Sequence, residues 1–428
     1  MTPAIFQVAG VVIVAAVVMQ VLILLVASFR RYSRQSAQQI HALELLNTQV
    51  NIAKGAIKEV QSSELSWPGL RKFTVRKKVA EGGDVFSFYL VPHDGKPLPA
   101  FKPGQFLTFN LHFRGKGRDA EKEVVRCYSL SDSPGHADCY RISIKKVLPP
   151  RDKPELPPGV ASSYFHDQLQ EGDILDLKAP SGKFFLDTAQ QSPVVLIGGG
   201  IGITPVLSMV NTIAELELKR EVWFFLGVRN QRDHIFKEHL QNLALEHENI
   251  RLNVCYSNPT DTDVEGEDYQ HNERVSVDLF KRVLPSNNYD FYICGPPPMM
   301  KSLTEGLKKW GVPNNHVYFE AFGPASVRKA PTEAERKDKG DAGPKYNVVF
   351  AKSNKTLPWD ASGGSILDFA LSNGMNIDSG CRAGNCGTCL TAIKSGQVTY
   401  IQEPGTVPET GTCLTCISAP SGDLTLDA

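Results

Sequence analysis

The sequence from Val194 to Pro205 is Val-Val-Leu-Ile-Gly-Gly-Gly-Ile-Gly-Ile-Thr-Pro. Its apolar start predicts a buried strand, and the glycines predict a tight turn that opens into a helix. Such a turn presents free backbone N–H groups and the positive end of a helix dipole, which together suit a pyrophosphate. The candidate dinucleotide-binding residues of this loop are Gly198, Gly199, Gly200, Gly202, Thr204 and Pro205.

Apolar segments alternate with turns and helical segments on the C-terminal side of this loop. This alternation predicts a parallel α/β sheet. Cys294, Gly295 and Pro296 close another apolar segment, and the carboxyl ends of parallel strands are where dinucleotides bind. We therefore expect these three residues at the same edge as the glycine loop. The predicted strands are Val194–Ile197, Val222–Val228, Leu252–Tyr256 and Phe291–Cys294.

Short strand-like segments precede this region. Glycine-containing turns such as Gly82-Gly83-Asp84 separate them, and no run of helical periodicity intervenes. This pattern predicts a small antiparallel barrel. The predicted strands are Lys72–Val79, Val85–Leu90, Phe106–Phe113, Cys127–Ser131, Tyr140–Val147 and Ile174–Leu177.

Five of the nine cysteines lie from position 381 to position 416. Cys381, Cys386 and Cys389 have the C-x4-C-x2-C spacing of a plant-type [2Fe–2S] site, with one further cysteine later in the chain. Glycines lie between these cysteines and allow the backbone to approach the sulfurs closely. Zinc is the rival metal, but this spacing is a poor match to its paired CxxC knuckles. Either Cys413 or Cys416 could be the fourth ligand.

The N-terminus contains an apolar run without charge from Val8 to Phe29. About 22 residues at 1.5 Å each span about 33 Å, which is enough for the hydrocarbon core of a bilayer. A cleaved signal peptide is the alternative, but the preceding residues carry no positive charge and the run is long for an h-region. Arg30, Arg31 and Arg34 follow, so we expect a single-pass anchor in the cell (inner) membrane with the catalytic domains in the cytoplasm.

The 428 residues suggest about three soluble domains beside the anchor. The 46 basic and 46 acidic residues balance, so nothing favours a nucleic acid as partner. Residues 325–345 are poor in large apolar residues and are predicted to be a linker. The predicted division is 1–34 transmembrane anchor, 35–66 helical stalk, 67–190 barrel, 191–324 α/β domain, 325–345 linker and 346–428 cluster domain.

Two further motifs carry a family resemblance. Arg126-Cys127-Tyr128-Ser129 fits an RxYS flavin motif, and the segment from Gly159 to Ser162 fits a Gly-x-x-Ser phosphate motif. With the glycine loop and the later Cys-Gly-Pro, the chain resembles the ferredoxin–NADP reductase superfamily. The resemblance implies that Tyr128 packs on the isoalloxazine, Ser129 approaches its N5 edge and Arg126 neutralises phosphate. The other flavin-binding residues that it implies are Ile142, Ile144, Lys145, Gly159, Val160, Ala161 and Ser162.

The resemblance also implies the residues around the hydride site. Phe322 would cover the flavin face where the nicotinamide stacks, and Cys294 would lie near the nicotinamide unless it is simply a buried apolar residue. With Ser129, these are the candidate catalytic residues. Arg229 either faces the adenosine ribose or is an ordinary surface arginine. The segment Leu-Thr-Cys-Ile-Ser-Ala-Pro around Cys416 resembles plant-type ferredoxins, which favours Cys416 as the last cluster ligand and implies a C-terminal β-grasp domain.

The order of flavin barrel, NAD(P) sheet and ferredoxin resembles the reductase components of multicomponent oxygenases. It implies an NAD(P)H-dependent oxidoreductase that passes electrons from NADH through FAD and [2Fe–2S] to an acceptor protein, such as a hydroxylase, oxygenase or desaturase. FMN and NADPH are the alternative cofactors. The Na⁺-translocating NADH:quinone oxidoreductase F subunit has the same modules and a membrane helix in another order, so a quinone reductase subunit is the alternative function. A redox sensor is a third hypothesis.

Overall fold

The computed structural model describes residues 19–20, 22, 24–25, 28–29, 65–67, 69–114, 121–136, 138–149, 154–320, 322, 346–359, 364–375, 377–380, 382, 384, 387–401, 404 and 408–428. The predicted anchor, stalk and linker lie almost entirely outside them. Within the described residues, no helix combines the length and apolar composition needed to cross a bilayer. The chain divides into two units, Met1–Gln61 and Ser62–Ala428, and every named strand lies in the second.

The first sheet is antiparallel and contains six strands in the order β4-β3-β6-β1-β2-β5. A single antiparallel bridge between Leu130 and Ile142 links the segment after β4 to β5, so the two ends of the sheet approach each other. Fully buried phenylalanines at 73, 88 and 109 fill its interior. The strands are β1 (Arg71–Gly82), β2 (Val85–Pro92), β3 (Phe106–Arg114), β4 (Glu121–Ser129), β5 (Tyr140–Lys145) and β6 (Ile174–Ser181).

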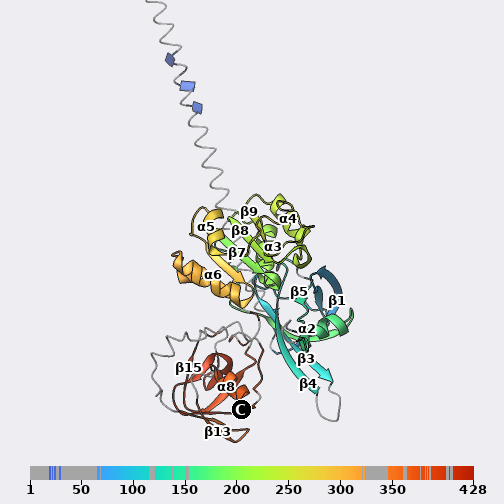
Figure 1. Ribbon diagram of the computed structural model, residues 1–428, viewed down its shortest axis with the longest axis vertical. Coiled ribbons are helices and arrows are strands. Elements are labelled where there is room, and N and C mark those ends of the chain that lie inside the picture. Colours follow the sequence, from blue (N-terminus) through green and yellow to red (C-terminus); the bar gives the residue numbers. More distant parts are fainter. Residues whose placement is uncertain are drawn as a thin grey trace, which may run out of the picture. The chain divides into compact units, whose positions relative to one another are not determined.

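A helical segment that sequence analysis did not predict interrupts this sheet region. It consists of α2 (Val160–Ser163) and a π-helical turn, η1 (Tyr164–Gln168). Such short elements do not contain enough turns for a 3.6-residue periodicity to show in the sequence. The predicted strand Cys127–Ser131 also differs, because β4 begins six residues earlier as the partner of β3 in a long hairpin (Figure 1).

The second sheet is parallel and has the order β11-β10-β7-β8-β9. Alternate residues of β7 face opposite layers: Val194 and Leu196 pack with the cluster that includes α3 (Ile203–Glu215), whereas Val195 and Ile197 pack with residues of α5 (Val277–Val283) and α6 (Pro297–Lys309). Burial on both faces explains the continuous apolar strands of this region. The strands are β7 (Val194–Gly199), β8 (Val222–Val228), β9 (Ile250–Tyr256), β10 (Asp290–Cys294) and β11 (Val317–Glu320).

Helices and short turns connect these strands. The helices are α3 (Ile203–Glu215), α4 (Lys237–Glu246), α5 (Val277–Val283) and α6 (Pro297–Lys309). The 3₁₀ turns are η2 (Gly200–Gly202), η3 (Gln231–Asp233) and η4 (Asn314–His316). The predicted parallel sheet is confirmed, and β11 is a fifth strand that sequence analysis did not predict.

The C-terminal region forms a mixed sheet in the order β13-β12-β18-β14-β16 and a two-stranded sheet of β15 and β17. Helix α8 begins with a capping box, in which Ser365 and Asp368 each accept from the other's backbone N–H. Its apolar side chains join the core of this α+β unit. The elements are β12 (Asn347–Phe350), β13 (Lys355–Pro358), α8 (Ile366–Ser372), β14 (Leu390–Ser395), β15 (Val398–Tyr400), β16 (Thr412–Leu414), η6 (Thr415–Ile417), β17 (Ser418–Pro420) and β18 (Leu424–Leu426).

Candidate functional site

The two flavin motifs meet through aromatic contacts. Tyr128 lies in β4, and its ring centroid is 5.2 Å from that of Phe165 in the helical segment that contains the Gly-x-x-Ser motif. Phe109 contacts both rings, at 5.7 Å from Tyr128 and 5.5 Å from Phe165. All three contacts are edge-to-face, the arrangement that aromatic quadrupoles favour. Burial raises the pKa of the Tyr128 phenol, so the ring is an uncharged and well-supported platform for a flat ligand.

Arg126 and Ser162, the predicted phosphate-binding residues, have different surroundings. Arg126 is exposed and donates to the carbonyl oxygen of Val125 at 2.7 Å. Ser162 is buried, donates to the carbonyl oxygen of Gly159 at 3.0 Å and accepts from the N–H of Val147 at 3.1 Å. The Ser162 hydroxyl therefore stabilises the turn itself. The adjacent Ser163 hydroxyl is buried with no protein partner among the described residues, which fits a ligand in this cradle.

The predicted flavin-lining strand is β5, at the end of the sheet order. The side chains of Ile142 and Ile144 are buried in the core, so only their backbone could face a ligand. His166 Nε2 donates to the carbonyl oxygen of Ile144 at 2.8 Å. Lys145 forms an ion pair with Asp233 at 3.2 Å. Val160 is half-exposed and Ala161 is buried.

The glycine loop packs directly against the turn after β10. A Cβ atom on Gly202 would lie 2.6 Å from the carbonyl carbon of Cys294 and 2.7 Å from the nitrogen of Gly295. A Cβ atom on Gly199 would lie 2.8 Å from Cδ of Pro296. These are backbone or ring atoms that cannot rotate away, so the two turns approach this closely only because glycine is present. The loop and the Cys-Gly-Pro turn thus form one surface.

Helix α3 begins at this surface with no side-chain cap. The hydroxyl of Thr204 donates to the carbonyl oxygen of Ile201 at 3.1 Å, and Pro205 in the first turn lacks a backbone N–H. The first N–H groups of a helix have no partner within the helix and form the positive end of its dipole. An uncapped, glycine-lined start to a 13-residue helix fits a pyrophosphate.

Ser129, Glu320 and Cys294 come together where the two sheets adjoin. Ser129 Oγ donates to Glu320 Oε2 at 3.3 Å. Glu320 ends β11 and pairs in register with Cys294 at the end of β10. Cys294 is fully buried, and this burial, with a smaller effect from Glu320, raises the pKa of its thiol well above the ordinary value. The thiol is therefore a neutral group beside the proposed nicotinamide position.

Glu320 is a functional candidate that sequence analysis missed. The residue as a whole is half-buried, but desolvation of its carboxyl raises its pKa to about 8, against a smaller lowering by the Ser129 hydrogen bond. Only β11 brings Glu320 beside Cys294, and this strand was not predicted. A carboxyl with this pKa can hold or release a proton near neutral pH.

Glu320→Gln should make the stability of the holoprotein less dependent on pH. The folded-state pKa of about 8 exceeds the ordinary value of 4.5, so stability from the protonated carboxyl is complete below about pH 4.5 and is lost as pH rises through 8. Between pH 5 and 9 the free energy of unfolding should fall by on the order of 2 kcal/mol more in the wild type than in the variant, allowing for partial exposure. Urea unfolding at several pH values measures this fall, with Glu305→Gln, at an exposed position of α6, as control. If the free energy of unfolding depended on pH in the same way in the wild type and in Glu320→Gln, the raised pKa of Glu320 would be contradicted.

Two other candidates lie at the surface. Arg229 directly follows β8 and is exposed, and its carbonyl oxygen accepts from the N–H of Asn258 at 2.9 Å. Phe322 is 38% exposed and lies two residues beyond Glu320. An exposed aromatic ring this close to the junction of the sheets is available to stack on a ligand.

The cluster region places two of the four predicted ligands together. Cys389 and Cys416 are buried, and their sulfurs lie 3.1 Å apart, which is too long for a disulfide and fits two thiolates that share one metal centre. Gly384 packs so closely on Ile417 that a Cβ atom would lie 3.1 Å from its Cγ1. Cys381 and Cys386 lie outside the described residues, and among the residues that are described no group of three or more acidic, histidine or cysteine side chains gathers around a metal position.

Cys413 has a different environment. It is fully buried in β16, opposite Thr391 of β14, and burial raises the pKa of its thiol to about 11. The sulfur of Cys416, in contrast, lies 3.1 Å from that of Cys389, which is the geometry expected of two ligands of one cluster.

Comparisons with protein families match three successive regions of the chain. An oxidoreductase FAD-binding domain matches residues 72–186, an oxidoreductase NAD-binding domain matches residues 196–305, and a 2Fe-2S iron-sulfur cluster binding domain matches residues 350–421. The predicted cofactors, FAD, NADH and [2Fe–2S], are confirmed, as is the predicted order of the three modules.

Individual relatives cover part of the chain. The flavohemoprotein of Bacillus thuringiensis subsp. konkukian is 38% identical over 277 residues, which are 65% of this chain and 67% of the relative. Among solved structures, the FAD/NAD-binding domain of nitric oxide dioxygenase from Vibrio cholerae O1 biovar El Tor has 31% identity and a TM-score of 0.51, covering 59% of this chain and 99% of that one. Phthalate dioxygenase reductase shares the fold at 24% identity and a TM-score of 0.51, covering 84% of this chain and 98% of its own.

Proposed function

We propose that this chain, which belongs to the ferredoxin–NADP reductase superfamily, delivers electrons from NADH to an oxygenase, hydroxylase or desaturase held at a membrane. The chain is an NAD(P)H-dependent oxidoreductase with FAD, NAD and [2Fe–2S] modules in one polypeptide. The observation that carries the proposal is this combination: a site for a two-electron donor is joined to a one-electron carrier. Such a chain suits an acceptor that takes electrons singly.

The residues of the chain supply position and electrostatics. A flavin bound here would supply hydride acceptance from the nicotinamide and one-electron transfer to the cluster. Tyr128, held by two phenylalanines, supports the ring system. Ser129 and Glu320 hold a proton at the junction of the two sheets. The start of α3 binds phosphate, and the neutral, fully buried thiol of Cys294 excludes water from its side of the site.

The membrane part of the proposal is supported by the apolar run from Val8 to Phe29 and the arginines that follow it. Deleting residues 1–34 should release the protein from the membrane fraction while leaving the reduction of ferricyanide by NADH unchanged. Cell fractionation and a steady-state assay measure the two effects. A truncated protein that still sediments with membranes would contradict tethering through this segment.

Anaerobic titration of the detergent-purified full chain with NADH tests the electron path. We expect the flavin absorbance and the cluster absorbance to bleach together, and denaturation to release FAD. Reduction by neither NADH nor NADPH would overturn the proposed function and favour the redox sensor. Membranes that contain this chain and reduce quinone with no oxygenase present would favour the quinone reductase subunit, for which the apolar N-terminal run is the supporting observation.

A further inference from the structure

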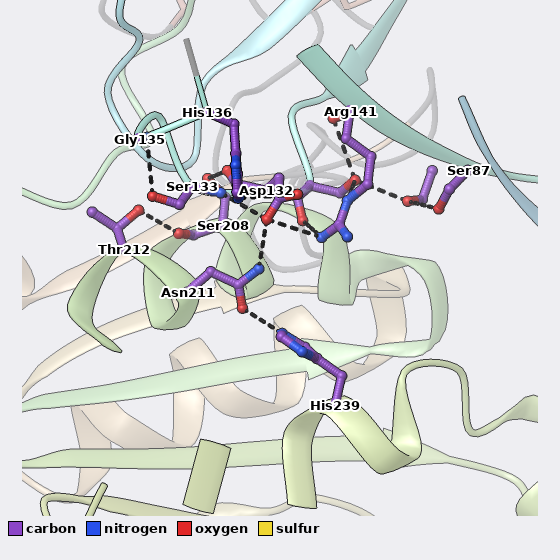
Figure 2. Close-up of polar contacts among 12 residues, drawn as sticks. Ser87, Asp132, Ser133, Gly135, His136, Arg141, Ser208, Asn211, Thr212 and His239 are labelled. Atoms are coloured by element: carbon purple, nitrogen blue, oxygen red, sulfur yellow. Dashed lines mark hydrogen bonds and ion pairs between the residues drawn. The ribbon is translucent and has the colours of Figure 1, made fainter. Parts of the chain in front are cut away.

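A polar cluster joins the loop after β4 to helix α3 (Figure 2). Asp132 follows Ser129 by three residues. Its carbonyl oxygen accepts from Ser208 Oγ at 2.7 Å, and its carboxylate Oδ1 accepts from Asn211 Nδ2 at 2.9 Å. Both donors lie on α3, and both are buried. The flavin module is therefore bonded directly to the helix that starts at the glycine loop.

The second side of the Asn211 amide is also occupied. Its Oδ1 lies 2.8 Å from Nε2 of His239 in α4 (Figure 2). Because Nδ2 donates to the Asp132 carboxylate, Oδ1 must face the imidazole, and His239 Nε2 is the donor of that bond. The amide is held from both ends, so its orientation is fixed and α4 is included in the connection.

Arg141 of β5 contacts the same carboxylate oxygen of Asp132 that accepts from Asn211. Its guanidinium lies 3.4 Å from Asp132 Oδ1, donates to the carbonyl oxygen of Ser131, and lies 5.4 Å from the centroid of the Phe236 ring just before α4. Only 11% of the Arg141 side chain is exposed. A guanidinium that is this buried and has partners in both modules fixes their spacing more firmly than an exposed ion pair would.

A chain of buried hydroxyls ties the loop back into the first sheet. Ser131 Oγ lies 2.8 Å from Ser143 Oγ, which in turn lies 2.8 Å from Ser87 Oγ on β2. All three residues are buried. Asp132 therefore projects from a rigid base in the flavin module.

From this geometry we propose that Asp132 and Arg141 are positioning residues for hydride transfer. They hold α3, and with it the glycine loop, in register with the flavin edge at Ser129. The inference rests on the proposed function, since it assumes that a nicotinamide bound at the loop must reach a flavin beside Ser129. Neither residue touches the reacting atoms. They act through α3, which begins directly after Gly202.

The size of the effect follows from the distance dependence of the reaction. The reacting atoms must come within about 3–3.5 Å, and a misplacement of about 1 Å can cost about 100-fold in rate. A helix moves as a unit, so a shift at Ser208 or Asn211 is transmitted to its first turn. Loss of this connection should therefore slow hydride transfer strongly, although the flavin and nucleotide sites are intact.

An exchange of charges tests the connection in the full-length holoprotein. Asn211→Asp places a second carboxylate against Asp132 and should slow flavin reduction by NADH at least about 10-fold in anaerobic stopped-flow measurements. The double variant Asp132→Asn/Asn211→Asp restores one donor and one acceptor across the contact. Its rate of flavin reduction by NADH should return to within about 3-fold of the wild-type rate. Ser208→Ala is a milder variant that removes one bond without adding charge, and it should give a smaller loss of the same kind.

Asp138→Asn is the matched control, because it breaks an exposed ion pair with Arg76 inside the flavin module. The nicotinamide–flavin charge-transfer absorbance should weaken in Asn211→Asp and return in the double variant, while reduction of flavin and cluster by dithionite stays unchanged in both. An Asn211→Asp protein as fast as the wild type, or a double variant as slow as the single, would overturn the inference. A wild-type protein inert to NADH would instead overturn the proposed function.

Discussion

Gly202→Val should reduce the rate of flavin reduction by NADH at least about 100-fold and leave the flavin bound. The new side chain would meet the backbone of Cys294 and Gly295, which cannot rotate aside, so the glycine loop and the Cys-Gly-Pro turn must separate. Separation misplaces the nucleotide relative to the flavin, and misplacement of about 1 Å can already cost this much in rate. Stopped-flow reduction by NADH measures the loss, and the visible spectrum reports flavin content.

Gly200→Asn is the matched control for this prediction. Gly200 has a φ of +55° and open space around the position of a Cβ atom. Asparagine tolerates this left-handed conformation better than most residues, so the variant should keep most of the NADH-driven reduction. If Gly200→Asn lost as much activity as Gly202→Val, contact with the Cys294 turn would not be the reason that the loop needs glycine.

Cys416→Ala should abolish the [2Fe–2S] cluster, whereas Cys413→Ala should keep it. Cys416 places its sulfur 3.1 Å from that of Cys389, and a plant-type cluster needs all four of its thiolates. Iron content and the electron paramagnetic resonance signal of the reduced protein should both disappear. Reduction of the flavin by NADH should continue in the same protein, because the flavin and nucleotide residues are unchanged.

Cys413→Ala tests the alternative ligand directly. Cys413 is a buried thiol in β16 whose pKa is raised to about 11, so its removal should cost only the lost packing of one small side chain, about 1 kcal/mol. The reduced protein should keep its full cluster signal. If Cys413→Ala lost the cluster and Cys416→Ala retained it, the assignment of the fourth ligand would be reversed.

Strands with long apolar runs were predictable from sequence. Val222–Val228 was predicted with the limits that β8 has, because a strand buried on both faces must be apolar along its length. Shorter elements were not. Four-residue β11 has a half-buried, half-exposed pattern, and α2 is just one turn long, so neither contains a period that the sequence could reveal.

For the candidate site too, only features that are local in the sequence were predictable. Motifs within a few residues of one another, such as the glycine loop and the cysteine spacing, were visible as patterns. Contacts between distant residues were not: Asn211 and Asp132 are 79 residues apart, and Ser129 and Glu320 are 191 residues apart. No local preference determines such pairs, because they depend on how the two modules pack.

The bond between Ser129 and Glu320 has a consequence for the order of events during synthesis. Ribosomes add about 5–20 residues per second, and domains generally fold as units, with the N-terminal one first. The 191 residues between the two partners then take roughly 10–40 s to make. The first module can thus fold around Tyr128 before Glu320 has been synthesised. The hydrogen bond between Ser129 and Glu320 forms only when β11, the last strand of the parallel sheet, has been translated and added to the sheet.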